Sequence, residues 1–595
     1  MTRTLSCREI YAAGDGHKTF KLYKFQKPYI DTLDNLRTVW YRIEQHLLHV
    51  DLMMEREGFN IDLDHLNGLR EKFGPILAKA EADLREAFGI NAHFIAKMNA
   101  DMERDDEDFN LQSPHHLGYL IYDVLGIDSN FGKKFNKPYR STAAEVVDAI
   151  CEDFEQLKPL LKFRKLNKLV TTYVDKIPNA LEPTTGKIHC RFNNLGSEED
   201  KKGGAATGRY SSSEYVSKKH SKTGAARGTN LQNIPSKGEG VEVRRSFVPD
   251  DDWIFLGADL SQIEPRIIAT ILADVYGDPS MQNFYREGKD LYVKMAMLTF
   301  GFDRDHCVDG AYDPSGEFQP RKLMKQGVLS YLYGSSAKAF ARNMGVSEDI
   351  AAMFFEKMIV AFPGLADFRA DVIQKLMTVG NNAYSETLYG RKRRFPNYRK
   401  NKKEFDAIEE KCLKDGLKIY VQINADGEFA LKGRDDEEQE EIDARRARVK
   451  AKKYTEADKE AITKIGLYWR NKDKKNRYWE VRGWVKSDER AALNHIVQGT
   501  AADIIKMNLV EMYRFTFANN FKTHCSIHDE IIISVPKANL TPELVEQVER
   551  IMTSTATIST PLKTDIVIME RWMDEVKPKD WDFDLGSPIE TKEVA

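Results

Sequence analysis

Two short apolar segments that end in acids constrain the fold of this chain most strongly. Residues 253–258 read Trp-Ile-Phe-Leu-Gly-Ala and run directly into Asp259. An apolar run of this length between polar residues is typical of a buried central strand. About 270 residues later, the sequence CSIHDEIIISV (525–535) has two apolar arms around His528 and Asp529, which predicts a hairpin with an acid at its turn. Each segment therefore presents a carboxylate at a strand end.

Asp259 and Asp529 together fit a site for divalent cations. Either acid alone is more simply explained as a turn or capping residue. As a pair on rigid strands, they supply the hard oxygen ligands that two-metal phosphoryl transfer needs, with the cations about 4 Å apart. Such cations lower the pKa of an attacking hydroxyl and stabilise the entering and leaving oxygens.

A helix with a stripe of useful side chains is expected after Pro320, which suits the first helical position. Arg321, Lys325, Leu329 and Tyr333 recur every four residues and therefore lie along one slowly drifting face. Two cations, an apolar side chain and an aromatic ring suit a triphosphate lying along the helix, with its base at the far end. From these residues alone, an ordinary amphipathic helix with snorkelling cations is the simpler alternative.

A second stripe follows Ser487, which is a suitable N-cap, and comprises Arg490, Asn494 and Gln498. Long hydrogen-bonding side chains suit the DNA minor groove, where purine N3 and pyrimidine O2 accept hydrogen bonds in every base pair. Such contacts check the shape of a base pair without selecting a sequence.

The long segments between these motifs are mostly helical in pattern. We expect a helix break at Gly499-Thr500, where Thr500 and Asp503 form a capping-box-like pair that restarts the helix. In the charged stretch 400–487, the sequence KIYVQINADGEFAL predicts a hairpin around Asp426-Gly427. Helices are expected at 46–88, 143–174, 282–300, 320–343 and 347–378.

Composition sets the remaining bounds. At 595 residues the chain is too long for one compact core. The net charge of −3 does not indicate a nucleic-acid partner, so a DNA-binding surface has to come from local clusters of Lys and Arg. The six cysteines form no C-x-x-C pair, and no apolar run approaches the ~18 residues of a membrane span. These features predict a cytoplasmic protein with no membrane partner.

The motifs, in this order, resemble those of family A DNA polymerases, and the resemblance extends over about nine-tenths of the chain. The matching motifs are Asp259-Leu-Ser-Gln262-Ile-Glu264-Pro-Arg266, Arg321-x3-Lys325-x7-Tyr333-Gly334, His528-Asp529-Glu530, Thr207-Gly208-Arg209-Tyr-Ser-Ser, Asn230-Leu-Gln232-Asn233-Ile-Pro235 and ERAALNHIVQGTAADIIK (489–506). The resemblance implies an α+β right-hand fold of thumb, palm and fingers, with an antiparallel palm sheet. The expected parts are an N-terminal extension (1–45), the thumb (46–190), the first part of the palm (191–280), the fingers (281–399), a charged insertion (400–487), and the second part of the palm with a C-terminal tail (488–595).

The resemblance also implies roles for individual residues in DNA-directed DNA synthesis. Asp259 and Asp529 are expected to bind two Mg²⁺ ions, for which Mn²⁺ is a substitute, with support from Glu530. Lys325 is the expected proton donor to pyrophosphate. The residues expected to contact the dNTP are Arg321, Lys325, Leu329, Tyr333, Glu264 and Gln262. The residues expected to contact primer–template DNA are Arg209, Asn230, Gln232, Arg490, Asn494, Gln498 and His528.

Two positions depart from the family pattern. Leu329 stands where many relatives carry Phe or Tyr against the incoming sugar, so we expect altered sugar discrimination. Pro265 follows Glu264, the residue expected to exclude a ribose 2′-OH, and should fix the start of the following helix.

No proofreading or 5′-nuclease activity is expected. The Asp-x-Glu triplets at Asp101, Asp105 and Asp153 lie in polar loop or helix patterns rather than on an apolar strand. A monomer of bacteriophage type is expected, with a helicase, primase, single-strand-binding protein or separate exonuclease as candidate partners. The insertion 400–487 either contacts DNA or another replication protein, or is a neutral surface addition.

Two alternatives stay open at this level. A single-subunit RNA polymerase shares the palm acids and the Lys and Tyr of the fingers, although Glu264 and the motif QGTAADIIK argue against it. A catalytically inactive relative that binds DNA as a scaffold is the other, although the expected catalytic positions other than Leu329 hold usable chemistry.

Overall fold

The computed structural model describes residues 7–135, 137–194, 196, 204–216, 227–380, 382–414, 421–423, 429–431 and 477–589. Most of the insertion 400–487, including the turn predicted at Asp426-Gly427, lies outside these residues. The two flanking strands are described and pair antiparallel as predicted, with Val421 opposite Leu431. Among the described helices, none is both long and apolar enough to cross a membrane.

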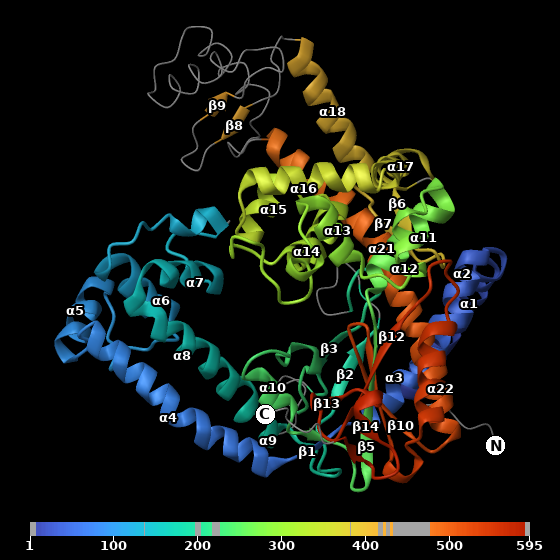
Figure 1. The fold of residues 1–595 in the computed structure, drawn as a ribbon, viewed down its shortest axis with the longest axis horizontal. Helices are drawn as coiled ribbons and strands as arrows, with labels where there is room; N and C mark the ends of the chain where they lie inside the picture. Colours follow the sequence, from blue (N-terminus) through green and yellow to red (C-terminus); the bar gives the residue numbers. More distant parts are fainter. Residues whose placement is uncertain are drawn as a thin grey trace.

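A five-stranded antiparallel sheet, in the order β10-β11-β5-β12-β13, forms the centre of the fold (Figure 1). The strands are β5 (Trp253–Leu260), β10 (Lys522–Ile527), β11 (Glu530–Pro536), β12 (Thr564–Met569) and β13 (Glu575–Val576). The apolar segment 254–258 is buried, as expected for a central strand. The two strand segments predicted from the sequence are direct neighbours, because β11 pairs with β5 from Glu530 opposite Asp259 to Pro536 opposite Trp253.

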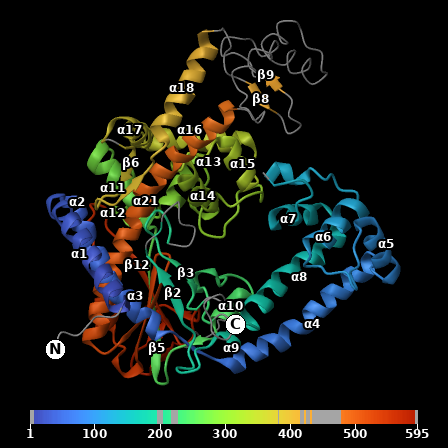
Figure 2. The ribbon, with the colours of Figure 1, turned by 180° about the vertical axis from the view of Figure 1, so that it is seen from behind.

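One long helix, α21 (Arg477–Ala518), crosses the molecule without interruption (Figure 2). The expected N-cap at Ser487 and the expected break at Gly499-Thr500 were therefore wrong. Thr500 Oγ1 donates to the carbonyl of Ile496 at 2.6 Å, which is a contact within the helix. Gly499 serves close packing, since a Cβ there would lie 2.7 Å from the side chain of Thr387.

An arm formed by residues 63–174 projects to one side of the sheet (Figures 1 and 2). Its main helices are α4 (Leu63–Ala87), α5 (Ala92–Met102), α7 (Ala144–Asp153) and α8 (Lys158–Leu169). A separate hydrophobic cluster that includes Leu84, Leu120 and Leu160 holds the arm together. The helix expected at 46–88 is two helices, α3 (Gln45–Glu57) and α4, because Gly58 turns the chain with φ +60°.

A helical cluster, residues 291–378, lies across from the arm (Figure 1). It comprises α13 (Leu291–Phe300), α14 (Pro320–Leu332), α15 (Ala337–Met344), α16 (Glu348–Ala361) and α17 (Gly364–Thr378). Pro320 occupies the first turn of α14, as predicted. The segments expected as single helices at 320–343 and 347–378 are each divided in two.

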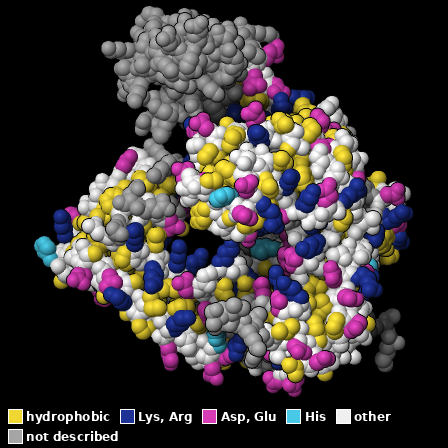
Figure 3. Space-filling view, in the orientation of Figure 1, with side chains coloured by type: hydrophobic (Ala, Val, Ile, Leu, Met, Phe, Trp, Pro, Cys, Tyr) yellow, Lys and Arg dark blue, Asp and Glu magenta, His cyan; other side chains and the backbone are white. Residues whose placement is uncertain are grey.

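The other helices and strands connect these parts. They are α1 (Cys7–Thr32), α2 (Asp34–Thr38), α6 (Pro114–Gly118), α9 (Ile177–Ala180), α10 (Gly240–Arg244), α11 (Ile263–Tyr276), α12 (Ser280–Arg286), α18 (Tyr398–Lys414), α22 (Pro542–Ser554), β1 (Asn60–Ile61), β2 (Cys190–Asn193), β3 (Ser211–Glu214), β4 (Phe247–Val248), β6 (Tyr384–Glu386), β7 (Lys392–Arg394), β8 (Val421–Ile423), β9 (Phe429–Leu431), β14 (Trp581–Asp582) and β15 (Ser587–Pro588). The molecule is hollowed between the arm and the rest of the chain, and Lys and Arg side chains gather along the edge of this hollow (Figure 3).

Candidate active site

The end of the central sheet brings together the two acids singled out in the sequence. Asp259 lies near the end of β5, directly opposite Glu530 on β11. Asp529 occupies the two-residue turn between β10 and β11, and its carbonyl accepts the N–H of Leu260 at 3.1 Å. His528 makes this tight turn with φ +55°, a conformation that His adopts more readily than most residues. The hairpin therefore fixes Asp529 beside the end of β5.

The carboxylates at this edge raise one another's pKa. Burial raises the pKa of Asp529 to about 6, with a further contribution from the charges of Glu264 and Asp259 and an opposing one from Arg209. Burial and then the charge of Asp259 raise the pKa of Glu530 to about 7. The pKa of Asp259 is raised by desolvation and by Asp565. In each case burial is the largest cause, the charges of neighbouring acids add to it, and the nearby cations do not offset the rise in pKa.

Two features of this edge were not predicted. Asp565 on β12 lies opposite Asp259 on the side away from Glu530, so three acids form a row across three strands. The sequence signal for Asp565 is the alternating strand pattern TDIVIM (564–569), in which Asp565 is the second residue. Gly257 leaves space for Glu530, because a Cβ at that position would lie 2.7 Å from Glu530 Oε1.

These side chains fit a site for hard divalent cations in which the substrate supplies some of the ligands. The two predicted ligands, Asp259 and Asp529, both provide carboxylate oxygens. In the described residues, no three or more His, Cys, Asp or Glu side chains converge to form a complete metal site. Mg²⁺ commonly binds proteins in this way, through one or two carboxylates together with water and substrate phosphates.

A chain of polar contacts links Asp529 to the helical cluster. The guanidinium of Arg209 lies 3.5 Å from the carboxylate of Asp529 and donates to Glu264. The hydroxyl of Tyr333, at the end of α14, donates to the other carboxylate oxygen of Glu264. Burial, followed by the charge of Glu264, raises the pKa of Tyr333 far above its ordinary value. The structure thus joins three residues that were predicted separately.

The two cations of α14 have different surroundings. Lys325 is exposed, and its charge partly opposes the rise in the pKa of Asp259. No hydrogen bond or ion pair joins Lys325 to another described residue. Arg321 is held by two acids, with Nη2 2.8 Å from Asp290 and Nη1 2.7 Å from Asp309. The charge of Lys325 therefore acts on Asp259 without a direct contact, whereas Arg321 is held by two acids.

The predicted DNA contacts divide into two groups. Arg490 and His528 are exposed, and the side-chain oxygen of Asn494 is enclosed without a hydrogen-bond partner among the described residues. Gln498 interacts with the hydroxyl of Tyr333, next to the acidic edge. By contrast, Asn230 and Gln232 are engaged in the protein: Asn230 bonds to Ser212 and Gln232 donates to the carbonyl of Tyr210. Two predicted dNTP contacts also lie within the protein. Gln262 accepts a hydrogen bond from the hydroxyl of Tyr285, and Leu329 is half-buried on α14.

The fold and the acidic edge define a right-hand polymerase of the α+β class. The chain belongs to DNA polymerase family A, which matches residues 82–413 and 443–574. The residues between these two ranges, 414–442, lie within the charged insertion 400–487.

Similar proteins include DNA polymerase I of Chloroflexus aurantiacus, 26% identical over 96% of this chain and 46% of its own length. The thermostable DNA polymerase I of Thermus aquaticus is 27% identical over 90% of this chain and 49% of its own length. The chain thus spans about half the length of these relatives. A solved structure of the POL domain of Pol1 from M. smegmatis, in complex with DNA primer-template and dNTP, has the same fold, with a TM-score of 0.62 and 23% identity over 93% of this chain and 73% of that one.

Proposed function

We propose that this chain is a template-directed DNA polymerase that extends a primer 3′-OH with dNTPs. The observation that carries the proposal is the pairing of β5 with β11, which brings Asp259 and Asp529 together at one end of the sheet. Membership of the family and the basic edge of the hollow in Figure 3 support DNA as the substrate.

The residues of the edge have distinct roles in this proposal. Asp259 and Asp529 would hold two Mg²⁺ ions, which would lower the pKa of the primer hydroxyl and offset negative charge on the phosphates. The 3′-oxygen attacks the α-phosphorus in line, and the bond to the β-phosphate oxygen breaks to release pyrophosphate. Lys325 gives a proton to that leaving oxygen, and Arg321 binds the triphosphate. No covalent enzyme intermediate forms, so the protein contributes position and charge.

Sugar and base selection involve the chain of contacts around Glu264. Tyr333 stacks at the nascent base pair while its hydroxyl holds Glu264, which then excludes a ribose 2′-OH. Arg209, Arg490, Asn494 and Gln498 contact the minor groove of the primer–template. Because Asn230 and Gln232 already bond within the protein, their contribution is to support the segment that carries Arg209.

The assignment of parts follows from the same proposal. The arm lies within the thumb (46–190), the helical cluster within the fingers (281–399), and the sheet belongs to the palm (191–280 and 488–595). Action as a monomer, with other replication proteins as partners, stays a prediction. The bacteriophage origin has no support from the relatives described above, which are bacterial.

Primer extension is the direct test. With Mg²⁺ and four dNTPs the wild type should extend a primed single-stranded template, whereas Asp529→Ala should not. Asp584→Ala, which changes an exposed acid in the C-terminal hairpin, is the matched control and should remain active. Binding of primed DNA without extension by the wild type would instead support the scaffold alternative. Preference for ribonucleotides in direct competition would support an RNA polymerase.

Leu329→Tyr should increase incorporation of dideoxynucleotides, because the position faces the incoming sugar in this proposal. The ratio of terminated to extended products measures the effect. An unchanged ratio would contradict the placement of Leu329.

We also propose that this chain has no 3′–5′ exonuclease activity of its own. Asp101 lies at the end of α5, where it accepts the hydroxyl of Tyr119, and Asp153 ends α7. Neither position is on a strand. Shortening of a labelled primer by pure protein, with Mg²⁺ and no nucleotides, would overturn this.

A further inference from the structure

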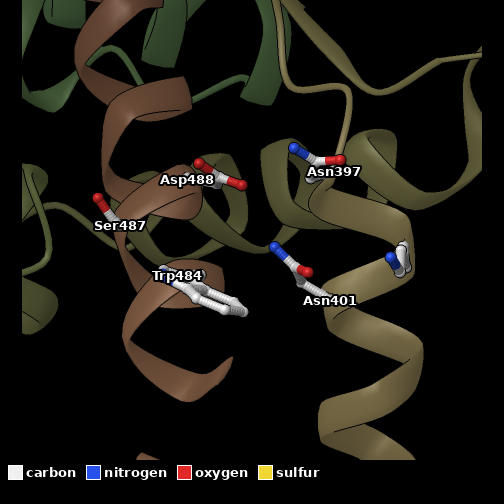
Figure 4. A pocket seen from close by; sticks show the side chains of 6 residues that line it. Asn397, Asn401, Trp484, Ser487 and Asp488 are labelled. Carbon is white, nitrogen blue, oxygen red and sulfur yellow. The ribbon is translucent and has the colours of Figure 1, made fainter. Parts of the chain in front are cut away.

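We propose that a polar pocket between α18 and α21 binds an unpaired nucleotide of the template strand ahead of the active site. The pocket has a volume of about 470 Å³. Figure 4 shows that it is lined from two sides, by the start of α18 and by α21. The lining residues are Asn397, Lys400, Asn401, Trp484, Ser487 and Asp488. The proposal rests on the polymerase function above.

The lining combines a stacking surface with groups that bond to base edges. Trp484 is 40% exposed, and its indole lies at the pocket beside Asn401 (Figure 4). Asn397 and Asn401 are one helical turn apart and face Trp484 and Asp488 across the pocket (Figure 4). Amide groups donate to and accept from base edges, and an aromatic face stacks on any base. This is the chemistry of a nucleobase site with little sequence preference.

The charge around the pocket suits a nucleic-acid backbone. Residues 391–403 include eight Lys or Arg and no acid. Several of these cations are already bonded: Arg391 pairs with Glu44 and Asp503, and Lys402 pairs with Asp406. Lys400 and Lys403 are exposed, and neither has an ion pair with another described residue.

The carboxylate of Asp488 argues for a base rather than a free triphosphate. Asp488 lines the pocket itself, where it would repel a cluster of phosphates. It can accept hydrogen bonds from the exocyclic amino groups of adenine, cytosine or guanine. An extended strand satisfies both conditions, with a base inside the pocket and its phosphates near the exposed lysines.

The position of the pocket fits the template strand that remains to be copied. Gln498, which reaches Tyr333 beside the active site, lies on the same helix as the pocket residues 484–488. At ~1.5 Å per residue along α21, the pocket is roughly 15–21 Å from Gln498. It lies on the side of the helical cluster and away from the arm (Figures 1 and 2). In this proposal the duplex lies between the arm and the central sheet, and the unpaired template strand continues from there toward the pocket.

The test compares primer–templates whose 5′ template overhang is one or twelve nucleotides long, with binding measured by fluorescence anisotropy at fixed salt. The wild type should bind the long overhang about 5- to 160-fold more tightly, the range expected for one stacked base. Trp484→Ala should lose most of that difference and keep its affinity for the short overhang. Trp484→Phe should restore part of it, because a phenyl ring still stacks.

Trp40→Ala is the matched control, because Trp40 is also an exposed tryptophan, at 38%. It should leave the overhang effect unchanged. Photocross-linking of 5-iodouracil in the overhang to Trp484 tests the contact in the unmodified protein. Equal wild-type affinity for both overhangs, or equal weakening of both by Trp484→Ala, would overturn the proposal. Extension of the short-overhang template by the same protein separates this outcome from failure of the polymerase assignment.

Discussion

Two groups of carboxylates in the molecule differ in how far neighbouring cations balance their charge. The first is the acidic edge of Asp259, Asp529 and Glu530. The second, here called the α21 ion network, comprises Glu44, Arg391, Asp503 and Lys506. In the network, Lys506 Nζ lies 2.9 Å from Glu44, and Arg391 Nε lies 2.7 Å from Asp503. The side chains of Asp503 and Lys506 are fully buried.

The pKa values reflect this difference. In the network, Lys506 and Arg391 outweigh burial and hold the pKa of Glu44 below its ordinary value. At the edge, burial and like charges raise the pKa of Asp529 to about 6. Burial dominates at the two innermost members of the network, where it raises the pKa of Asp503 and lowers the pKa of Lys506. The network therefore connects α21 to the segment before α3 at a desolvation cost, which its paired charges offset only while all of them are present. The edge carries uncompensated charge, which costs stability and is available to a cation.

Removing a charge from the edge should have the largest effect, and it should be on catalysis. We expect Asp259→Asn to lower the single-turnover extension rate at least about 10³-fold, because an amide cannot supply the negative charge that holds the cation. Asp565→Asn, its neighbour on β12, should cost less than about tenfold. Equal loss in both variants would show that Asp565 is a third metal ligand.

Removing a charge from the network should reduce stability instead. Glu44→Gln leaves Arg391 and Lys506 opposite Asp503 alone, so we expect the free energy of unfolding to fall by about 3 kcal/mol in urea titrations. Glu570→Gln breaks the exposed pair with Lys537 and should cost less than about 1 kcal/mol. Similar losses in both variants would contradict the distinction between buried and exposed pairs.

The protein should become more stable when a charge is removed from the acidic edge. In metal-free protein at pH 8, Asp529→Asn should raise the free energy of unfolding by about 1–3 kcal/mol. Because the pKa of Asp529 is raised in the folded protein, its ionised carboxylate lowers the free energy of unfolding fully above about pH 6. This loss disappears below the unfolded-state pKa of ~3.9. Thermal unfolding with EDTA from pH 4 to pH 8 measures this gain.

Asp250 is the control, because its substitution should change the stability of the protein in the opposite direction. Its pKa is lowered because bonds from Lys522 and Asn60 outweigh burial. Asp250→Asn should therefore destabilise the protein at pH 8. A gain in both variants would exclude charge as the cause.

The smallest effect should come from the acids that hold Arg321. Asp309 is 86% exposed and pairs with the guanidinium that is proposed to bind the triphosphate, so it would compete with that ligand. Asp309→Asn should lower the KM for dNTP by roughly twofold to fivefold without changing kcat, as expected for a surface ion pair. Asp305→Asn, which changes another exposed acid in the same loop, should leave both constants unchanged.

The parts of the site that could be predicted are those that depend on local pattern. The apolar runs located β5 and the β10–β11 hairpin, and with them Asp259 and Asp529. The spacing of four after Pro320 located the stripe on α14. The prediction at Gly499-Thr500 failed because packing against Thr387 and a hydrogen bond within the helix outweighed the local preference for a break.

The sequence by itself determined the apolar strand segments around Asp259 and Asp529, the helix after Pro320 and the short motifs that carry acids and cations, since these depend on neighbours along the chain. Only the tertiary structure decided which charges are balanced. Glu44 and Lys506 are 462 positions apart, and Arg209, Glu264 and Tyr333 belong to three separate segments. Burial and the distance between charges set the pKa and the energy of a carboxylate, and both arise only when distant segments pack together.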